Sequence, residues 1–247
     1  MSSDTEIGGH NHAFMNTPWT DILSMKMLSQ DDRRGKLDSL FRKYWRPVYF
    51  FIRRKGKGNE EAKDLAQAFF AKMIDVDIVN RANPDKGRFR NYLLASVTRF
   101  IASPEGRKTE GKLSYPKGTA FIHQMSSEDM PDIEPSHDAT PEKEFNRQWA
   151  ISLLNNILTK LREMCESANS PDSFTVFEKR LLTGTSPYGA NMRIADEMGI
   201  KVSEVEAHYK KALRWYRYLL RQEVAACVEK PSEIEDEIRD LWHILAQ

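Results

Sequence analysis

Histidine, cysteine and acidic side chains most often carry catalysis or metal binding, and in this chain they form no known catalytic pattern. Cys165 and Cys227 stand 62 positions apart, which fits neither a paired-cysteine zinc site nor a disulfide framework. The sequence contains no glycine-lysine phosphate loop, no His-Glu-x-x-His segment and no nucleophile with a base at motif spacing. We therefore expect a protein that is not an enzyme and holds no cofactor and no metal.

A functional spacing does occur in residues 191–214. Ala195 and Gly199 are four positions apart, and a small residue followed by glycine permits the close crossing and sharp turn of a helix-turn-helix. We expect its second helix to begin near Val202 and to run past Arg221. Four apolar residues are positioned to form the shared core of the two helices: Ile194, Met198, Ile200 and Val205.

Basic side chains follow along this second helix and could contact DNA. Its N-terminal part would enter the major groove, and the later basic residues would meet phosphates. Ordinary helical hairpins show the same pattern, and Glu204 and Glu206 stand where base-contacting residues are expected. A carboxylate can accept a hydrogen bond from cytosine but repels phosphates. The residues expected to contact DNA are Lys201, Ser203, Lys210, Lys211, Arg214 and Arg217.

Charge is strongly segregated along the chain, although the net charge of all 247 residues is only +1. Residues 31–117 carry +10, residues 118–146 carry −6, residues 147–230 carry +3 and residues 231–247 carry −4. Such blocks are expected of a protein that contacts nucleic acid at two places, and solvated helix faces produce the same runs. The longest apolar runs have five residues, so we expect a cytoplasmic protein with neither a secretory signal nor a membrane segment.

Helical periodicity dominates the sequence and strand patterns are missing, which predicts an all-α fold. An apolar stripe over residues 37–52 is interrupted by Pro47, which we expect to kink or restart the helix. A further helix is expected from Phe89 to Ala102, ended by Ser103 before a proline. The remaining helices are expected after Asn59, at Thr140, at Phe174 and over Glu233–Leu245.

The polar, proline-containing stretch of residues 105–143 predicts an acidic linker between two small helical domains. We expect the domains to comprise residues 14–104 and 144–230. Residues 1–13 are expected to be a disordered N-terminus, and residues 231–247 a C-terminal helix.

Three segments, in this order, resemble the extracytoplasmic-function (ECF) group of bacterial RNA polymerase sigma factors. The first is YWRPVYFFIRRKGKGNEEAKDLAQAFFAKMI (Tyr44–Ile74), the second is NPDKGRFRNYLLASVTRFIA (Asn83–Ala102), and the third is the helix-turn-helix with its tail to Leu241. FMNTPWTDIL (Phe14–Leu23) and RQWAISLLNNIL (Arg147–Leu158) fit the larger planctomycete-type members. The resemblance covers about 200 residues and implies a region 2-like first domain and a region 4-like second domain.

The resemblance implies a sigma factor that binds core RNA polymerase and directs promoter-specific initiation. The matching positions for docking on the polymerase clamp are Glu60, Glu61, Asp64 and Gln67. Those for capturing the melted −10 element of promoter DNA are Asn83, Lys86, Arg88, Arg90 and Arg99. Those for the −35 element are Lys201, Ser203, Glu206, His208, Lys210, Lys211 and Arg214. Family recognition helices often carry basic residues where Glu206 and His208 stand here.

The family resemblance further implies control by an anti-sigma protein or another inhibitory partner. Two alternatives remain open at this point. One is a helix-turn-helix DNA-binding regulator that acts without the polymerase, and the other is a sigma-like protein-interaction module. An enzyme whose catalytic residues are scattered along the chain is a third and less favoured reading.

Overall fold

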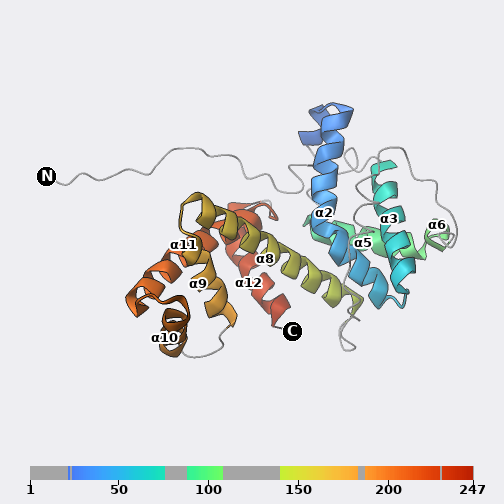
Figure 1. The fold of residues 1–247 in the computed structure, drawn as a ribbon. Helices are drawn as coiled ribbons and strands as arrows, with labels where there is room; N and C mark the ends of the chain where they lie inside the picture. Colours follow the sequence, from blue (N-terminus) through green and yellow to red (C-terminus); the bar gives the residue numbers. More distant parts are fainter. Residues whose placement is uncertain are drawn as a thin grey trace.

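The computed structural model of the protein describes residues 22, 24–75, 88–107, 140–182, 187–228 and 230–246. Within these ranges the chain is helical and has no strand, so the predicted all-α fold is confirmed (Figure 1). The predicted N-terminal tail and nearly all of the predicted linker lie outside the described residues. No helix in the described ranges combines the length and the apolar sequence that crossing a bilayer requires.

Helices α2 (Gln30–Arg54) and α3 (Asn59–Asp75) form the first helical hairpin. The short 3₁₀ helix η1 (Met25–Met27) precedes them. Ser29 caps α2, because its hydroxyl accepts a hydrogen bond from a backbone N–H in the first turn at 3.2 Å. Gly56 lies in the turn between the two helices with a φ of +88°, a conformation that costs glycine little.

Helix α2 continues through Pro47, so of the two expected outcomes, a kink or a restart, the structure excludes the restart. Proline removes one backbone hydrogen bond and costs a helix about 3 kcal/mol. Burying a single large apolar side chain stabilises the fold by about 1.5–3 kcal/mol. In α2 every residue of the predicted apolar stripe is buried, which offsets the cost of the proline. Its members are Leu37, Leu40, Phe41, Tyr44, Val48, Phe51 and Ile52.

Helix α5 (Phe89–Ala102) ends where the sequence predicts, because Ser103 is extended. The single turn α6 (Pro104–Arg107) follows it. Two aromatic contacts hold α5 against the first hairpin. The ring of Phe89 meets Tyr44 of α2 at 5.2 Å between centroids, and Phe100 meets Phe69 of α3 at 5.7 Å.

The second half of the chain begins with the long helix α8 (Pro141–Ser167), capped by Thr140. The Thr140 hydroxyl accepts a hydrogen bond from the backbone N–H of Lys143 at 3.2 Å. The elements that follow are α9 (Pro171–Leu182), α10 (Pro187–Met198), α11 (Val202–Ala225), η3 (Pro231–Glu233) and α12 (Ile234–Leu245).

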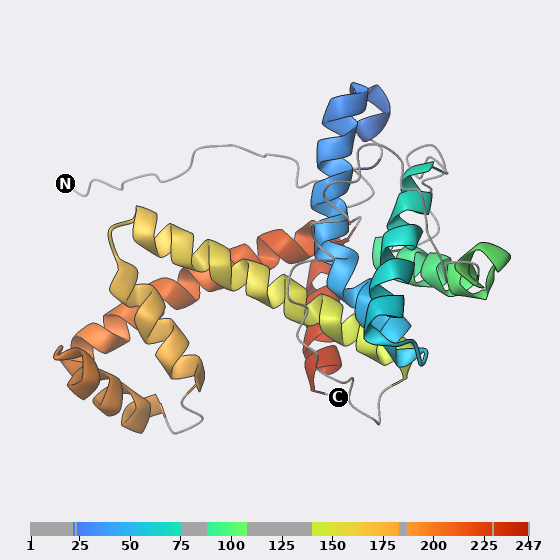
Figure 2. The same cartoon turned by 45° about the vertical axis from the view of Figure 1, so that its right-hand side comes forward.

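The two halves share one hydrophobic core along the seam between α2 and α8 (Figures 1 and 2). Phe145 of α8 is fully buried, and its ring stands edge-on to Phe51 of α2 at 6.3 Å between centroids. Beside it, Arg46 Nε donates a hydrogen bond to Gln148 Oε1 at 2.8 Å. The predicted division into two domains stays a prediction, and the structure adds that the two stretches pack together.

Candidate nucleic-acid interface

Helices α10 and α11 meet at a sharp turn centred on Gly199. Gly199 has a φ of +65°, in the left-handed region that glycine adopts at low cost. The N–H of Ile200 donates to the carbonyl of Ala195 at 3.1 Å, which is the bond of a Schellman C-cap. The predicted Ala-x-x-x-Gly segment therefore ends one helix and turns the chain into the next, as a helix-turn-helix requires.

A small core of its own holds this turn together. Ile194 and Ala195 of α10 and Val205 of α11 are buried against Val176 of α9, and Met198 and Ile200 pack around them. The contribution of α9 was not predicted, because Val176 lies outside the motif. The sequence does carry an indication of this contribution, because the apolar residues Phe174 and Phe177 lie on either side of Val176.

One face of α11 carries a row of exposed residues spaced alternately four and three positions apart. This spacing keeps side chains on a single helix face. We refer to this face as the basic row of α11. Its members are Ser203, Ala207, Lys210, Arg214, Arg217 and Arg221, all exposed to solvent. Four of the six carry a positive charge, and these cations form a line about 16–17 Å long within a row of about 27 Å.

The two glutamates that weakened the DNA-binding prediction have local roles. Glu204 accepts a hydrogen bond from the backbone N–H of Lys201 at 2.7 Å and so caps α11. Glu206 accepts from the side-chain amide of Asn191 in α10 at 2.9 Å and pairs with Lys210 at 3.3 Å. The hydrogen bond and charge of Lys210 lower the pKa of Glu206. Neither carboxylate is therefore an isolated negative charge facing a phosphate.

Two other residues predicted for the −35 element contact other side chains of the protein, His208 one on α9 and Lys211 one on α11 itself. His208 Nδ1 lies 3.0 Å from the hydroxyl of Ser173 in α9. Lys211 Nζ sits over the ring of Trp215 at 5.0 Å from its centroid. Lys201, which is exposed, lies at the start of the basic row. The structure thus separates the predicted set into an outward basic row and an inward group that packs the motif.

Of the residues predicted for the −10 element, the three that the structure describes do not all lie together. Asn83 and Lys86 lie outside the described residues. Arg88 and Arg90 stand at the N-terminal end of α5, where carboxylates of α12 contact both. Arg99 is exposed near the other end of α5. The nine positions between Arg90 and Arg99 correspond to about two and a half turns, so these two side chains leave opposite faces of the helix.

The predicted polymerase-docking residues lie on α3. Glu60, Glu61 and Asp64 are on the solvent side, and we call them the acidic face of α3. Two lysines partly neutralise this face, since Lys63 pairs with Glu60 at 3.0 Å and Lys57 pairs with Glu61 at 2.6 Å. Gln67 differs from the other three, because its side chain is only 6% exposed.

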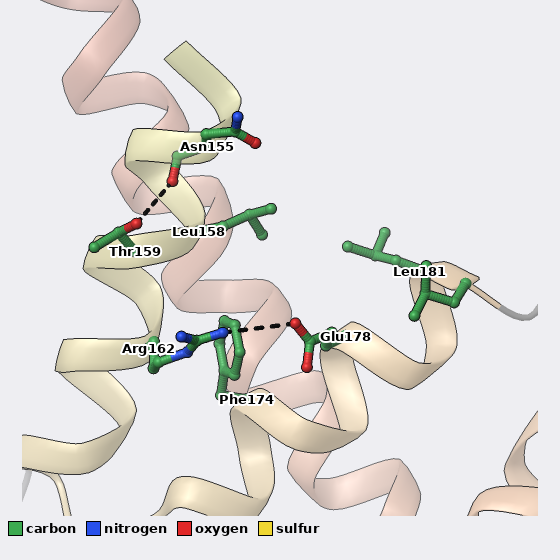
Figure 3. Close-up of a pocket in the computed structure, with 8 residues that line it drawn as sticks. Asn155, Leu158, Thr159, Arg162, Phe174, Glu178 and Leu181 are labelled. Atoms are coloured by element: carbon green, nitrogen blue, oxygen red, sulfur yellow. Dashed lines mark hydrogen bonds and ion pairs between the residues drawn. The ribbon is translucent and has the colours of Figure 1, made fainter. Parts of the chain in front are cut away.

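A hollow of about 350 Å³ lies between α8 and α9. Figure 3 shows Leu158 of α8 and Leu181 of α9 pointing toward each other across it. At its base, Arg162 stacks over Phe174 at 4.6 Å from the ring centroid and pairs with Glu178 at 3.6 Å. Besides this exposed ion pair, the lining combines apolar side chains with the polar residues Asn155 and Thr159. Within the described ranges, no group of three or more His, Cys, Asp or Glu could hold a metal ion.

The thiol of Cys227, at the C-terminal end of α11, is held in its protonated form. Burial, and then the charge of Glu237, raise the pKa of Cys227 to about 12. A free thiol with a pKa near 9 is about one-tenth ionised at pH 8, and this one about one part in 10⁴. We expect iodoacetamide at pH 8 to modify Cys227 on the order of 10³ times more slowly in the folded protein than in urea, as measured by peptide mass spectrometry.

The pH dependence checks the sign of this shift. Because the folded pKa is raised, the folded protein binds the proton more tightly, and this thiol lowers the free energy of unfolding only as pH rises above about 9. The folded-state rate should still rise tenfold per pH unit between pH 8 and pH 10. Equal rates in the folded and unfolded protein would contradict the assignment.

Comparison with known protein families, with curated proteins and with solved structures finds no significant match to this chain.

Proposed function

We propose that the chain is a sigma factor that acts in the cytoplasm, binds core RNA polymerase and directs initiation at particular promoters. The basic row of α11 would contact the −35 element, and the acidic face of α3 would contact basic residues of the polymerase clamp. An anti-sigma protein or another inhibitory partner would control it. Catalysis of phosphodiester formation would belong to the polymerase, and the chain itself would supply recognition.

The observation that carries the proposal is the basic row in its helix-turn-helix setting. The turn at Gly199 and the small core around Val205 fix α11 relative to α10. The exposed face of α11 then offers Lys210, Arg214 and Arg217 in line, which suits the phosphates beside a major groove. The glutamates near its start are engaged in capping and packing, which removes the main objection to DNA binding.

The experiment that tests the proposal combines binding with transcription. Purified chain is mixed with bacterial core RNA polymerase, and the complex is used for run-off transcription on genomic fragments. Co-purification together with discrete new start sites supports a sigma factor. Tight duplex binding by the isolated chain, without polymerase binding, supports the polymerase-independent regulator instead. Polymerase binding without new start sites supports the interaction module.

Charge reversal on the acidic face of α3 makes the docking assignment testable. We expect the triple variant Glu60→Lys, Glu61→Lys, Asp64→Lys to lose co-purification with core polymerase by at least tenfold, because opposite charges across an interface attract and like charges repel. The three side chains are solvent-facing, so the fold should be retained, as checked by circular dichroism.

A matched control reverses three exposed acids on α8 and α9 that have no predicted role. These are Glu163, Glu166 and Asp172, changed to lysine in the same way. The control raises the net charge by the same amount and should bind polymerase as the unchanged protein does. Equal loss in both triple variants would indicate a non-specific charge effect and overturn the docking assignment.

A further inference from the structure

We propose that helix α12 is an internal inhibitor whose carboxylates occupy an anion site at the N-terminal end of α5. In its absence, Arg88 and Arg90 would hold the backbone phosphates of single-stranded DNA. The inference deepens the proposed function and rests on it, since it assigns these arginines to the melted −10 strand. It adds that the chain closes this site with its own C-terminal helix.

The contacts that close the site join residues about 150 positions apart in the chain. Glu237 bridges both arginines, with Arg90 Nη1 at 2.7 Å from Oε1 and Arg88 Nη1 at 2.6 Å from Oε2. Arg88 Nη1 also donates to Asp240 Oδ2 at 2.8 Å. We call these four residues the α5–α12 cluster. Carboxylates here take the positions that phosphate oxygens would take, because both anions accept from guanidinium groups in the same geometry.

Arg90 is held in place by a group outside α12, and Arg88 lies at a helix end that favours anions. The guanidinium of Arg90 lies over the ring of Trp149 in α8, at 4.4 Å from the centroid, an arrangement that favours a cation. Arg88 is the N-cap residue of α5, where the positive end of the helix dipole favours anions. The guanidinium of Arg90 would therefore remain positioned to accept another anion if α12 moved away, and Arg88 would remain next to it at the same helix end.

The carboxylate that fills the site is poorly suited to it. Glu237 is 1% exposed, and its Oε2 has no well-aligned hydrogen-bond donor among the described residues. Burial raises the pKa of Glu237, and the charges of Arg90 and Arg88 only partly oppose this. A buried ion pair contributes little net stability because desolvation offsets the attraction. A phosphate that keeps part of its hydration can therefore compete with Glu237 for the two cations.

Helix α12 also reaches the basic row of α11. Glu235 of α12 pairs with Arg221, the last member of that row. The apolar face of α12, which includes Ile234 and Leu241, packs against the core, and the helix contacts α8 and α11 (Figure 2). The segment of residues 231–247 carries a net charge of −4. Its charge and its contacts with two predicted DNA-binding regions fit an element that mimics nucleic acid.

The test uses the full-length chain and a fluorescein-labelled single-stranded thymidine 20-mer. In the double variant Glu237→Gln, Asp240→Asn the amides keep the shape and the acceptor oxygens but remove both charges. We expect this variant to bind the oligonucleotide at least tenfold more tightly than the unchanged protein in fluorescence anisotropy at 50 mM salt. The slope of log affinity against log salt should steepen by about 1.4, which is two phosphate contacts on a single strand.

A matched control removes one Glu and one Asp charge elsewhere. Glu163→Gln lies on the exposed face of α8, and Asp236→Asn lies on α12 but pairs with Arg239 of the same helix. This control should bind the oligonucleotide within twofold of the unchanged protein. Asp240→Asn alone removes the more exposed carboxylate of the α5–α12 cluster and leaves the buried one intact. It should give an intermediate gain of about threefold.

Hydrogen exchange supplies a readout that tests displacement directly. Saturating oligonucleotide should speed amide exchange in residues 234–245 of the unchanged protein. No gain in affinity for the double variant over the control, or tighter binding with α12 still protected, would overturn the inference. If the double variant gains affinity for the oligonucleotide but the chain does not co-purify with polymerase, the proposed function is refuted and the nucleic-acid site closed by α12 is supported. If the chain co-purifies with polymerase but the double variant gains no affinity for the oligonucleotide, only the proposal of internal inhibition is refuted.

Discussion

Replacing Lys210, Arg214 and Arg217 with alanine should lower promoter-specific run-off transcription on the order of 10²-fold. Each cation that neutralises a duplex phosphate contributes about 0.9 to the slope of log affinity against log salt. Losing three should reduce that slope for the polymerase complex by about 2.7. Alanine favours helix, and the three positions are exposed, so α11 itself should persist. The measurement is promoter binding by the assembled polymerase complex across a salt series.

The control for this variant removes three exposed cations that lie on other helices than α11. Lys43, Lys143 and Arg147 are exposed and lie on α2 and α8. Their alanine variants should leave the salt slope and transcription close to those of the unchanged protein. Polymerase co-purification should be the same in both triple variants. If transcription by the Lys210, Arg214, Arg217 variant were undiminished, the basic row would not be the DNA contact.

Phe145→Ala should lower the free energy of unfolding by about 3–5 kcal/mol. The phenyl ring is fully buried in the seam and meets Phe51 edge-on, so its removal loses transfer energy and leaves a cavity. Because the two halves share one core, the substitution should destabilise both halves. Urea unfolding measures the loss of free energy, and hydrogen exchange with peptide mass spectrometry shows where it occurs. In the exchange experiment, α3 and α8 should lose protection together.

The control is Tyr218→Ala, which removes an aromatic ring that is 55% exposed on α11. Substitutions of exposed side chains usually change stability by no more than about 0.5 kcal/mol. Two separate unfolding transitions in Phe145→Ala, with α3 unaffected, would show that the halves are energetically independent. That result would favour the predicted pair of domains over a cooperative unit.

Local rules predicted the elements well wherever one residue type decides the backbone. Ser103 before a proline ended α5, Thr140 capped α8, and Gly199 took the positive φ between α10 and α11. Pro47 was the exception. Its local preference was overridden because both flanks of α2 bury large apolar side chains, and tertiary burial outweighs the loss of one hydrogen bond.

Pairing between distant residues could not be predicted, because it depends on tertiary geometry. The sequence around Arg88 and Arg90 does not indicate whether the two side chains face solvent or pair with carboxylates about 150 positions later. Gln67 is a polar residue that was grouped with three acids of the docking face, yet it is buried, since helical phase places it on the inner side of α3. From the sequence, Glu206 was expected to weaken DNA binding. Its hydrogen bond with Asn191, which accounts for a glutamate at this position, is visible only in the structure.

The seam between α2 and α8 also bears on how the chain is made. Phe51 leaves the ribosome 94 residues before its partner Phe145. At synthesis rates of about 5–20 residues per second, that interval lasts roughly 5–19 s. During it, the apolar face of α2 that α8 will cover has no partner helix to pack against. We therefore expect this helix face to be the part of the nascent chain that needs shielding from aggregation until α8 emerges and covers it.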